Sequence, residues 1–398
     1  MDGHEPTDFI TLFPHWIEND FGANGTKHVL EKFDALTLTQ RPKLAAQTQL
    51  IDDGSGDLKV YRIDYEDITD IPKRYGTVFY SGNCYIIHYQ LLISGSTSVP
   101  GNSIQNLLYL WVGKQCSQSD KTTGELFLAE MFEHFKTSVA QIRVAEGLEP
   151  PHFLQLFKGK LIIFNGKSSS ADPTGTGKKY PNSFILKVMG NSSYTAKAVQ
   201  VSNKTIYTPK DCYIIKVDSE IWIWCGQFST GDTREVGKLI ASIVGEPNLI
   251  MEGNETDEFY ASVGDKCVNQ LKKTQIIGTI EEVSLESSWE KARVGLYLTT
   301  LVQGTITLEQ ILAFDQKDLS PENIYLLDAG NIIYVWLGNL SELEQRQASW
   351  VIAMHHLSIH SIPRDNHLPV AVIKQGFEPI TFIGFFDKWD LKHFEVKT

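Results

Sequence analysis

The sequence predicts an α+β protein built from three tandem copies of one domain. The main observation is a strand-like phrase that recurs three times, at 109–117 (YLWVGKQCS), 221–229 (IWIWCGQFS) and 333–341 (IYVWLGNLS). Each copy runs from aromatic and β-branched residues through one glycine into the polar start of a helix. The glycines, Gly113, Gly226 and Gly338, are about 110 residues apart, which indicates a repeated domain because solenoid units recur every ~20–50 residues.

The elements of the first copy, 53–167, follow from its hydrophobic patterns. Alternation or short apolar runs predict strands, and Asp120–Thr137 places Leu126, Phe127, Phe132 and Phe135 at helical spacing beside acidic residues. A proline at the first helical position indicates a short helix at Pro151–Phe157. The expected strands are Lys59–Ile63, Cys84–Tyr89, Leu107–Val112, Gln141–Val144 and Lys160–Phe164.

The second copy, 182–282, and the third, 292–398, repeat this order. Each is expected to place a mixed β-sheet between one long and one short helix. In the second copy the expected strands are Ser183–Val188, Cys212–Val217 and Ile221–Cys225, and the helices Thr233–Val244 and Glu255–Val263. In the third they are Ile324–Leu327, Ile332–Leu337 and Val370–Ile373, and the helices Glu342–His356 and Ile380–Phe385.

The chain opens on a phrase that matches the ends of the repeats. EPTDFITLFPHWI, within 1–17, is similar to GLEPPHFLQLFKGK at 147–160 and GFEPITFIGFFDKW at 376–389. We therefore expect 1–17 to be the end of a preceding domain of the same kind. The polar stretch 18–52 is expected to be a linker, and 168–180 and 283–291 flexible joints.

The amino-acid composition of the chain argues against several classes of function. Hydrophobic residues make up 42% of the chain and charged residues 21%, as in ordinary globular proteins, and the net charge is −12. An acidic chain argues against nucleic acid, whose phosphates require clustered lysine and arginine. Neither a run of about 18 apolar residues nor a secretory signal pattern occurs. The five cysteines, an odd number without C-x-x-C spacing, suggest a reducing, cytoplasmic compartment.

Three phrases in register with the repeat resemble the gelsolin/villin family of actin regulators. They are YGTVFYSGNCY at 75–85, GLEPPHFLQLFKGK at 147–160 and VIKQGFEP at 372–379. The resemblance covers nearly the whole chain, as the last three of six gelsolin-like domains plus the end of the third. IWCGQFSTGDTRE at 223–235 is closer to villin-type chains, although no villin headpiece is found. The resemblance implies actin binding in the cytoplasm and cytoskeleton, calcium-controlled activation and, in many members, sensitivity to phosphoinositide headgroups.

The resemblance also implies where calcium would bind in each repeat. Family domains use a carbonyl and an Asp carboxylate before a strand, a Glu at the start of the long helix and a later carbonyl. Calcium needs six to eight oxygen ligands, and its affinity depends on their charge. No repeat keeps both carboxylates, so we expect weak or lost calcium binding and no required cofactor. The matching positions are Gly82, Asn83 and Asp120 in the first repeat, Lys210, Asp211 and Thr233 in the second, and Glu322, Asn323 and Gln345, beside Glu344, in the third.

In the family, the long helix of the first repeat lies in a cleft of actin. The matching positions that would face actin are Leu126, Ala129 and Glu130, while Phe132 replaces an Asp that helps to bind a bridging calcium. The leading hypothesis is therefore a non-enzymatic actin-binding module that depends little on calcium, with capping, severing or bundling left open. The alternative is a scaffold whose gelsolin-like domains bind another protein.

Other patterns favour structural interpretations. The tryptophans before the three glycines indicate strand cores rather than ligand stacking. Asp52–Asp57 lacks the glutamate of an EF-hand and indicates a turn. Cys84 and His88 would lie ~13 Å apart along a strand, too far for a nucleophile–base pair. A solvated surface is favoured over a lipid-binding site for five lysines, Lys158, Lys160, Lys167, Lys178 and Lys179. A structural role is favoured over zinc binding for three histidines, His355, His356 and His360.

Overall fold

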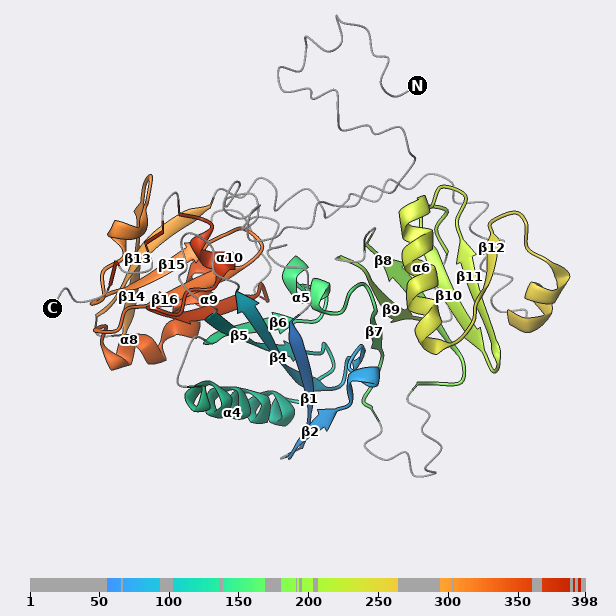
Figure 1. Ribbon diagram of the computed structural model, residues 1–398, viewed down its shortest axis with the longest axis horizontal. Helices are drawn as coiled ribbons and strands as arrows, with labels where there is room; N and C mark the ends of the chain where they lie inside the picture. Colours follow the sequence, from blue (N-terminus) through green and yellow to red (C-terminus); the bar gives the residue numbers. More distant parts are fainter. Residues whose placement is uncertain are drawn as a thin grey trace, which may run out of the picture. The chain divides into compact units, whose positions relative to one another are not determined.

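The protein divides into two units, Met1–Lys32 and Phe33–Thr398, and only the second contains described residues. The computed structural model, shown in Figure 1, describes residues 56–65, 67–93, 103–135, 139–168, 180–190, 192, 195–202, 207–263, 294–302, 304–359, 367–386, 389–390 and 393–394. The expected domain end at 1–17, the expected linker at 18–52 and most of both joints lie outside these residues.

The first repeat contains the expected elements in the expected order. Its long helix starts at Ser117, whose hydroxyl accepts a hydrogen bond from the Asp120 backbone N–H at 3.1 Å and so caps the helix. The elements are β1 (Asp57–Asp64), β2 (Asp67–Ile71), η1 (Lys73–Tyr75), β3 (Val78–Tyr80), β4 (Cys84–Ile93), β5 (Ser103–Val112), α4 (Gln118–His134), β6 (Val139–Ala145), α5 (Pro151–Leu156) and β7 (Leu161–Phe164).

The second repeat follows the same plan. Its elements are β8 (Phe184–Met189), β9 (Lys197–Val201), β10 (Cys212–Val217), β11 (Glu220–Cys225), α6 (Gly231–Val244) and β12 (Asn248–Met251), and residues 257–263 are helical. The helix α6 is capped by Thr230 in the way that Ser117 caps α4. In this repeat the predicted strand and helix bounds agree with the structure to within about two residues, whereas β4 and β5 of the first repeat are each four residues longer than predicted.

The third repeat departs from its prediction at the long helix. Its elements are β13 (Gly295–Val302), β14 (Thr305–Ile311), η3 (Gln316–Asp318), β15 (Ile324–Asp328), β16 (Ile333–Leu337), α8 (Leu343–Gln347), α9 (Ser349–Ile359), β17 (Val370–Lys374) and α10 (Ile380–Ile383). The single helix expected at Glu342–His356 is thus two helices. The helix α8 buries no side chain, whereas α9 buries Ile352, Ala353, His356 and Leu357, so the break falls where the chain enters the core.

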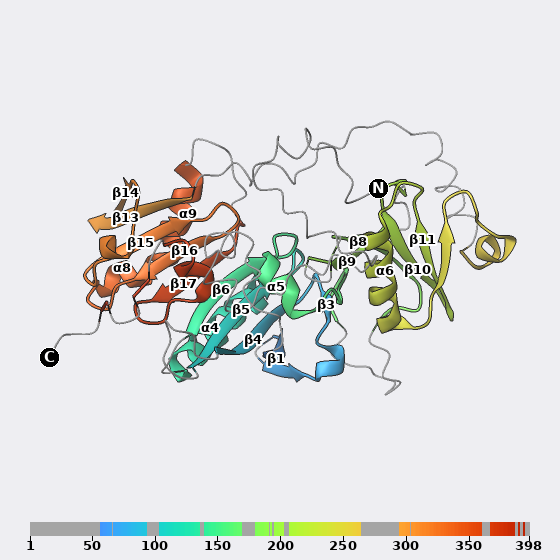
Figure 2. The same cartoon turned by 45° about the horizontal axis from the view of Figure 1, so that its top comes forward.

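The strands form two sheets that cross repeat boundaries. One has the order β14-β13-β15-β16-β17-β6-β5-β4-β1-β2 and joins the third repeat to the first (Figure 2). The junction is antiparallel and pairs Val370 with Arg143 and Val372 with Gln141. The other sheet, β12-β11-β10-β8-β9-β7-β3, takes β3 and β7 from the first repeat into the sheet of the second. The sequence predicted a sheet for each repeat but not these shared ones.

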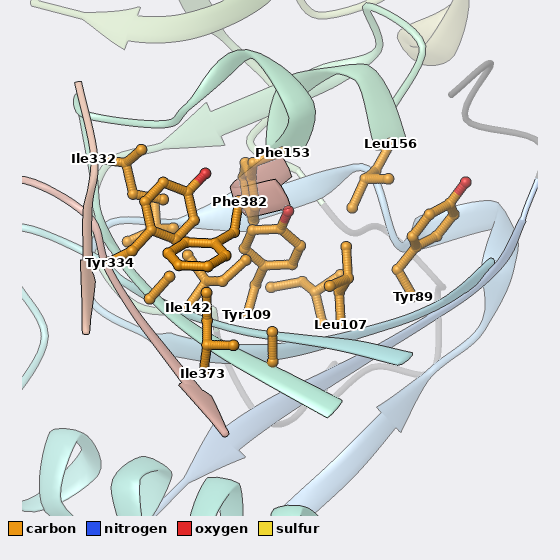
Figure 3. Close-up of a cluster of buried hydrophobic side chains, with 14 of the residues drawn as sticks. Tyr89, Leu107, Tyr109, Ile142, Phe153, Leu156, Ile332, Tyr334, Ile373 and Phe382 are labelled. Atoms are coloured by element: carbon orange, nitrogen blue, oxygen red, sulfur yellow. The ribbon is translucent and has the colours of Figure 1, made fainter. Parts of the chain in front are cut away.

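The largest buried cluster accordingly combines two repeats. Figure 3 shows Tyr109 and Phe153 of the first repeat packed with Tyr334 and Phe382 of the third above the strands. The Tyr334 and Phe382 ring centroids are 5.6 Å apart, and those of Tyr109 and Phe153 are 5.3 Å apart. The first and third repeats therefore share one core as well as one sheet.

The three repeated glycines are required by close backbone contact. A Cβ atom at Gly113, Gly226 or Gly338 would lie 2.1, 2.2 or 2.1 Å from a carbonyl oxygen, that of Ser81, Pro209 or Pro321 respectively. None of the three has a positive φ. Glycine is therefore required at these positions by contact with a neighbouring segment rather than by a left-handed backbone conformation.

The tryptophans before these glycines are core residues, as predicted. Trp111, Trp224 and Trp336 are completely buried. Each indole N–H donates to a glutamate at the start of the following short helix, at 2.9 Å to Glu149, 2.8 Å to Glu255 and 2.7 Å to Glu378. The same Trp–Glu pair thus fixes the same turn in all three repeats.

Candidate functional site

The helix α4 packs on the sheet of the first repeat through one face. Leu128 is buried, and Gly124 allows close approach, since a Cβ there would lie 2.8 Å from the Cys84 sulfur. The helix lies against β1, β4 and β5 of its own repeat (Figure 1). The opposite face of α4 is consequently left to solvent.

The three residues expected to face actin all lie on that solvent face. Ala129 and Glu130 are exposed, and Leu126 has 62% of its surface exposed. The structure therefore brings Leu126, Ala129 and Glu130 together as one exposed strip of α4, which we call the α4 face.

Phe132 lies beside this strip but is partly covered. It packs against the core cluster beneath α4, and the Lys374 ammonium of β17 lies 3.9 Å from the centre of its ring. Arg143 of β6 also stands 4.5 Å over the Trp350 ring and 3.9 Å from a Glu125 carboxylate oxygen. Phe132 therefore contributes to packing between α4 and the third repeat and has no oxygen that could ligate a metal.

The expected calcium positions of the first repeat converge at the start of α4. Asn83 is buried, its side-chain oxygen accepts from the Ser168 N–H at 2.8 Å, and the Gly82 N–H donates to the Gly166 carbonyl at 2.7 Å. Asp120, also buried, accepts from the Tyr65 N–H at 3.1 Å. Gly82, Asn83 and Asp120 are thus tied to the short segment that follows β7.

That segment supplies a residue whose role the sequence did not reveal. The Lys167 ammonium lies 2.7 Å from Asp120 Oδ2. Burial opposes ionisation of Asp120, but Lys167, with Ser117 and the Tyr65 N–H, outweighs it and lowers the pKa of the carboxyl. The ion pair with Asp120 likewise raises the pKa of Lys167. Lys167 is exposed, as its place among the lysines of a solvated face predicts, but the sequence did not reveal that it also pairs with Asp120.

The second repeat shows a similar pairing at its retained acid. The Lys187 ammonium of β8 lies 2.7 Å from Asp211 Oδ2, and the Thr208 hydroxyl donates to the same oxygen. Lys210 is exposed. Thr233, at the position expected for the helix acid, is instead in the first turn of α6, where its N–H donates to the Thr230 cap.

In the third repeat the residues at the expected calcium positions are more exposed to solvent. Glu322 is exposed and bonds to the Ser320 hydroxyl, which lowers the pKa of its carboxyl. The Asn323 carbonyl accepts from the Gly338 N–H at 3.0 Å, as the Asn83 carbonyl does from Gly113 and the Asp211 carbonyl from Gly226. Glu344 is exposed in the first turn of α8 and Gln345 is half-buried. These three carbonyls therefore make the same backbone hydrogen bond in each repeat.

One histidine of the set considered for zinc binding makes a structural hydrogen bond instead. His356, considered for zinc, is buried and bonded to Asp328 at 2.8 Å, and His360 lies outside the described residues. Within the described ranges, no group of three or more His, Cys, Asp or Glu side chains could hold a metal ion. None of the helices described is long and apolar enough to span a membrane.

Comparisons with known proteins agree with the repeat pattern. The sequence model of the gelsolin repeat matches residues 77–154 and 305–383. The villin-like protein quail of Drosophila melanogaster is 33% identical, over 98% of this chain and 48% of its own length, and advillin of Mus musculus 29%, over 98% and 46%. The chain thus spans about half the length of these two relatives.

A third relative is matched over most of its length. Gelsolin of Xenopus laevis is 30% identical, over 92% of this chain and 84% of its own. The crystal structure of the Thorarchaeota 2DGel3/rabbit actin complex matches 52% of this chain and 100% of that one at 17% identity, but its TM-score of 0.21 carries no structural argument. With the recurring Trp–Glu turns and the two matched repeats, the match to gelsolin shows that this chain belongs to the gelsolin family.

Proposed function

We propose that this chain is an actin-binding regulator of the gelsolin/villin type and that the α4 face makes its contact with actin. The observation that supports this is the exposure of Leu126 in one strip with Ala129 and Glu130. A single exposed leucine is ordinary on a protein surface. The exposure of Leu126 supports the proposal because Leu126 occupies a position that the family resemblance assigns to the contact with actin.

The proposed binding depends little on calcium. In the first repeat the retained acid is paired with Lys167, in the second with Lys187, and in the third the helix position holds Gln345. A cation that must displace an ammonium group binds less tightly than one that meets a free carboxylate. Filament capping, severing and bundling remain separate activities that a full-length protein of this family could combine with the contact proposed here.

Co-sedimentation with actin filaments, once in excess EGTA and once in calcium, tests this proposal. We expect equal pelleting in both conditions. Ala129→Asp places a charge in the proposed contact without touching the core and should weaken binding at least tenfold, about 1.4 kcal/mol. Ser242→Asp, at an exposed position of α6, is the matched control and should pellet like the unchanged chain.

Two results would contradict the proposal in different ways. Unchanged pelleting of Ala129→Asp would remove the α4 face as the contact. Absence of pelleting of the unchanged chain in both conditions would favour the scaffold alternative, in which these domains bind another protein.

A further inference from the structure

Asp120 lies where three segments of the first repeat meet. It is in the first turn of α4, and 1% of its side chain is exposed. One carboxylate oxygen accepts from the N–H of Tyr65, in the turn between β1 and β2, and the other faces the segment after β7. A buried carboxylate is costly unless a positive charge or several donors compensate it. The compensation at this point therefore decides whether the three segments stay together.

Lys167 provides that compensation from within the chain. Its ammonium lies 2.7 Å from Asp120 Oδ2 and 4.5 Å from the centre of the Tyr65 ring. The segment that carries it is held in place, because the Gly166 carbonyl accepts from Gly82 at 2.7 Å and the Gly166 N–H donates to the Gln115 side chain at 3.1 Å. The ion pair is therefore set by fixed backbone on both sides, not by a side chain that happens to reach across the surface.

We propose that the Lys167 ammonium is a built-in cation, which fills the position beside Asp120 that a divalent cation would need and holds the first repeat together without one. This proposal goes beyond the proposed function and does not depend on actin binding. It also differs from simple loss of ligands, since it predicts that removing one lysine restores a response to calcium.

The surrounding residues do not fit calcium while Lys167 is present. Calcium binds carboxylate oxygens at 2.3–2.6 Å, and the ammonium already lies 2.7 Å from Oδ2 of the same carboxylate. The Asn83 side-chain oxygen accepts from Ser168, and the nearby Asp64 carboxylate is paired with Arg62 at 2.6 Å. A divalent ion would therefore meet an ammonium and two oxygens that already have partners.

The second repeat repeats this arrangement with a lysine from a different element. Lys187 comes from β8, whereas Lys167 follows β7, yet each lies 2.7 Å from the acid that its repeat retains. The two lysines are similarly exposed, Lys187 at 29% and Lys167 at 37%, but Asp211 is 22% exposed where Asp120 is 1% exposed, so leaving Asp211 without its lysine costs less. We therefore expect the weaker effect in the second repeat.

The test is Lys167→Met, which removes the ammonium and keeps an unbranched apolar stem beside Tyr65. In EGTA the melting temperature of the purified chain should fall by several degrees. Calcium should reverse that fall, and titration calorimetry should show calcium binding in the ~10⁻⁴–10⁻³ M range, at least tenfold tighter than in the unchanged chain. Lys167→Met with Asn83→Asp adds a carboxylate and should bind more tightly still.

Two further variants act as controls. Lys121→Ala removes the lysine next to Asp120 on α4, which makes no ion pair with Asp120 among the described contacts, and should change neither readout. Lys167→Met combined with Asp120→Asn should lose the calcium response. The proposal is overturned if Lys167→Met melts like the unchanged chain, if it loses stability without gaining calcium binding, or if the unchanged chain already binds calcium at micromolar concentration. Should Lys167→Met not fold, Lys167→Gln takes its place with the same expected results.

Discussion

The first and third repeats place a glutamate at the same position of the turn before the short helix, but the charges around the two carboxylates differ. Glu149 and Glu378 each accept from the buried tryptophan of their repeat, at 2.9 and 2.7 Å, and from the N–H of a glycine two residues earlier, at 3.0 Å in both cases. The local geometry of the two turns is therefore the same.

The charges around the two carboxylates differ. Burial opposes ionisation of Glu149, but the Lys197 ammonium of the second repeat, bonded to it, outweighs burial and lowers the pKa of the carboxyl. At Glu378 burial dominates over the hydrogen bonds from Trp336 and Gly376 and raises the pKa. The backbone of a repeat thus fixes the position of an acid, while a charge from a neighbouring repeat shifts its pKa.

The largest effect is expected at Glu149. Glu149→Gln leaves the Lys197 ammonium, only 9% exposed, without its carboxylate, and removing one partner of a buried ion pair costs about 3–5 kcal/mol. Hydrogen exchange in urea, read separately for each repeat because several domains need not unfold together, should show the loss in the first two repeats.

A double variant makes this prediction sharper. Glu149→Gln with Lys197→Met replaces both charges and should recover most of the lost stability. If the single variant were as stable as the unchanged chain, the ion pair would not distinguish the first repeat from the third.

An equal effect in both repeats is expected at the close-contact glycines. Gly113→Ala and Gly338→Ala each place a methyl group 2.1 Å from a backbone carbonyl oxygen, so each should lose about 3 kcal/mol. Thermal unfolding followed by tryptophan fluorescence measures both. A large inequality between the two would mean that the repeats do not share one framework, and Gly231→Ala, with open space around it, is the control.

The smallest effect on stability is expected for Glu378→Gln, which should stabilise the protein where the preceding substitutions destabilise it. Because the pKa of Glu378 is raised on folding, wild-type stability is highest below the unfolded value of about 4.3 and falls as pH rises through the folded pKa. Glu378→Gln keeps the acceptor for Trp336 and removes this loss, so at pH 7 it should equal or exceed wild-type stability by up to about 1 kcal/mol.

Urea titrations at pH 4 and pH 7 measure this change. The advantage of Glu378→Gln should shrink at the lower pH. For Glu149, whose pKa is lowered on folding, the difference between wild type and Glu149→Gln should instead be full above about pH 4.3 and shrink as pH falls below it. Relative to wild type, Glu378→Gln should therefore lose stability and Glu149→Gln should gain it as the pH falls, and a change of the same sign at both positions would contradict the comparison.

Much of the fold could be predicted from the sequence because its strands and helices follow hydrophobic patterns among residues close together in the chain. The strand–glycine–helix phrase located three cores, and the buried tryptophans and close-contact glycines are the residues that made it visible. The exposed position of Leu126 agrees with the resemblance alone, because the helical spacing placed it in one apolar set with Phe127, Phe132 and Phe135. These features depend on residues close together in sequence.

The remainder depends on which distant segments meet. Lys167 is 47 positions beyond Asp120 in the printed sequence, and nothing in its own neighbours distinguishes it from Lys158 or Lys160. Lys197 belongs to a different repeat from Glu149, and the shared sheets join strands of different repeats. Ion pairs between segments and pairing between repeats leave no periodic signal, so only the structure reveals them.

The junction between β6 and β17 has a consequence for synthesis of the chain. Its paired residues, such as Arg143 and Val370, are roughly 230 positions apart, so closing this loop carries a large entropic cost and comes late in folding. While a ribosome makes the second repeat, the edge of β6 that will pair with β17 has not yet met its partner. Unpaired strand edges promote association between chains. The nascent first repeat therefore presents an unpaired strand edge until the third repeat has been synthesised.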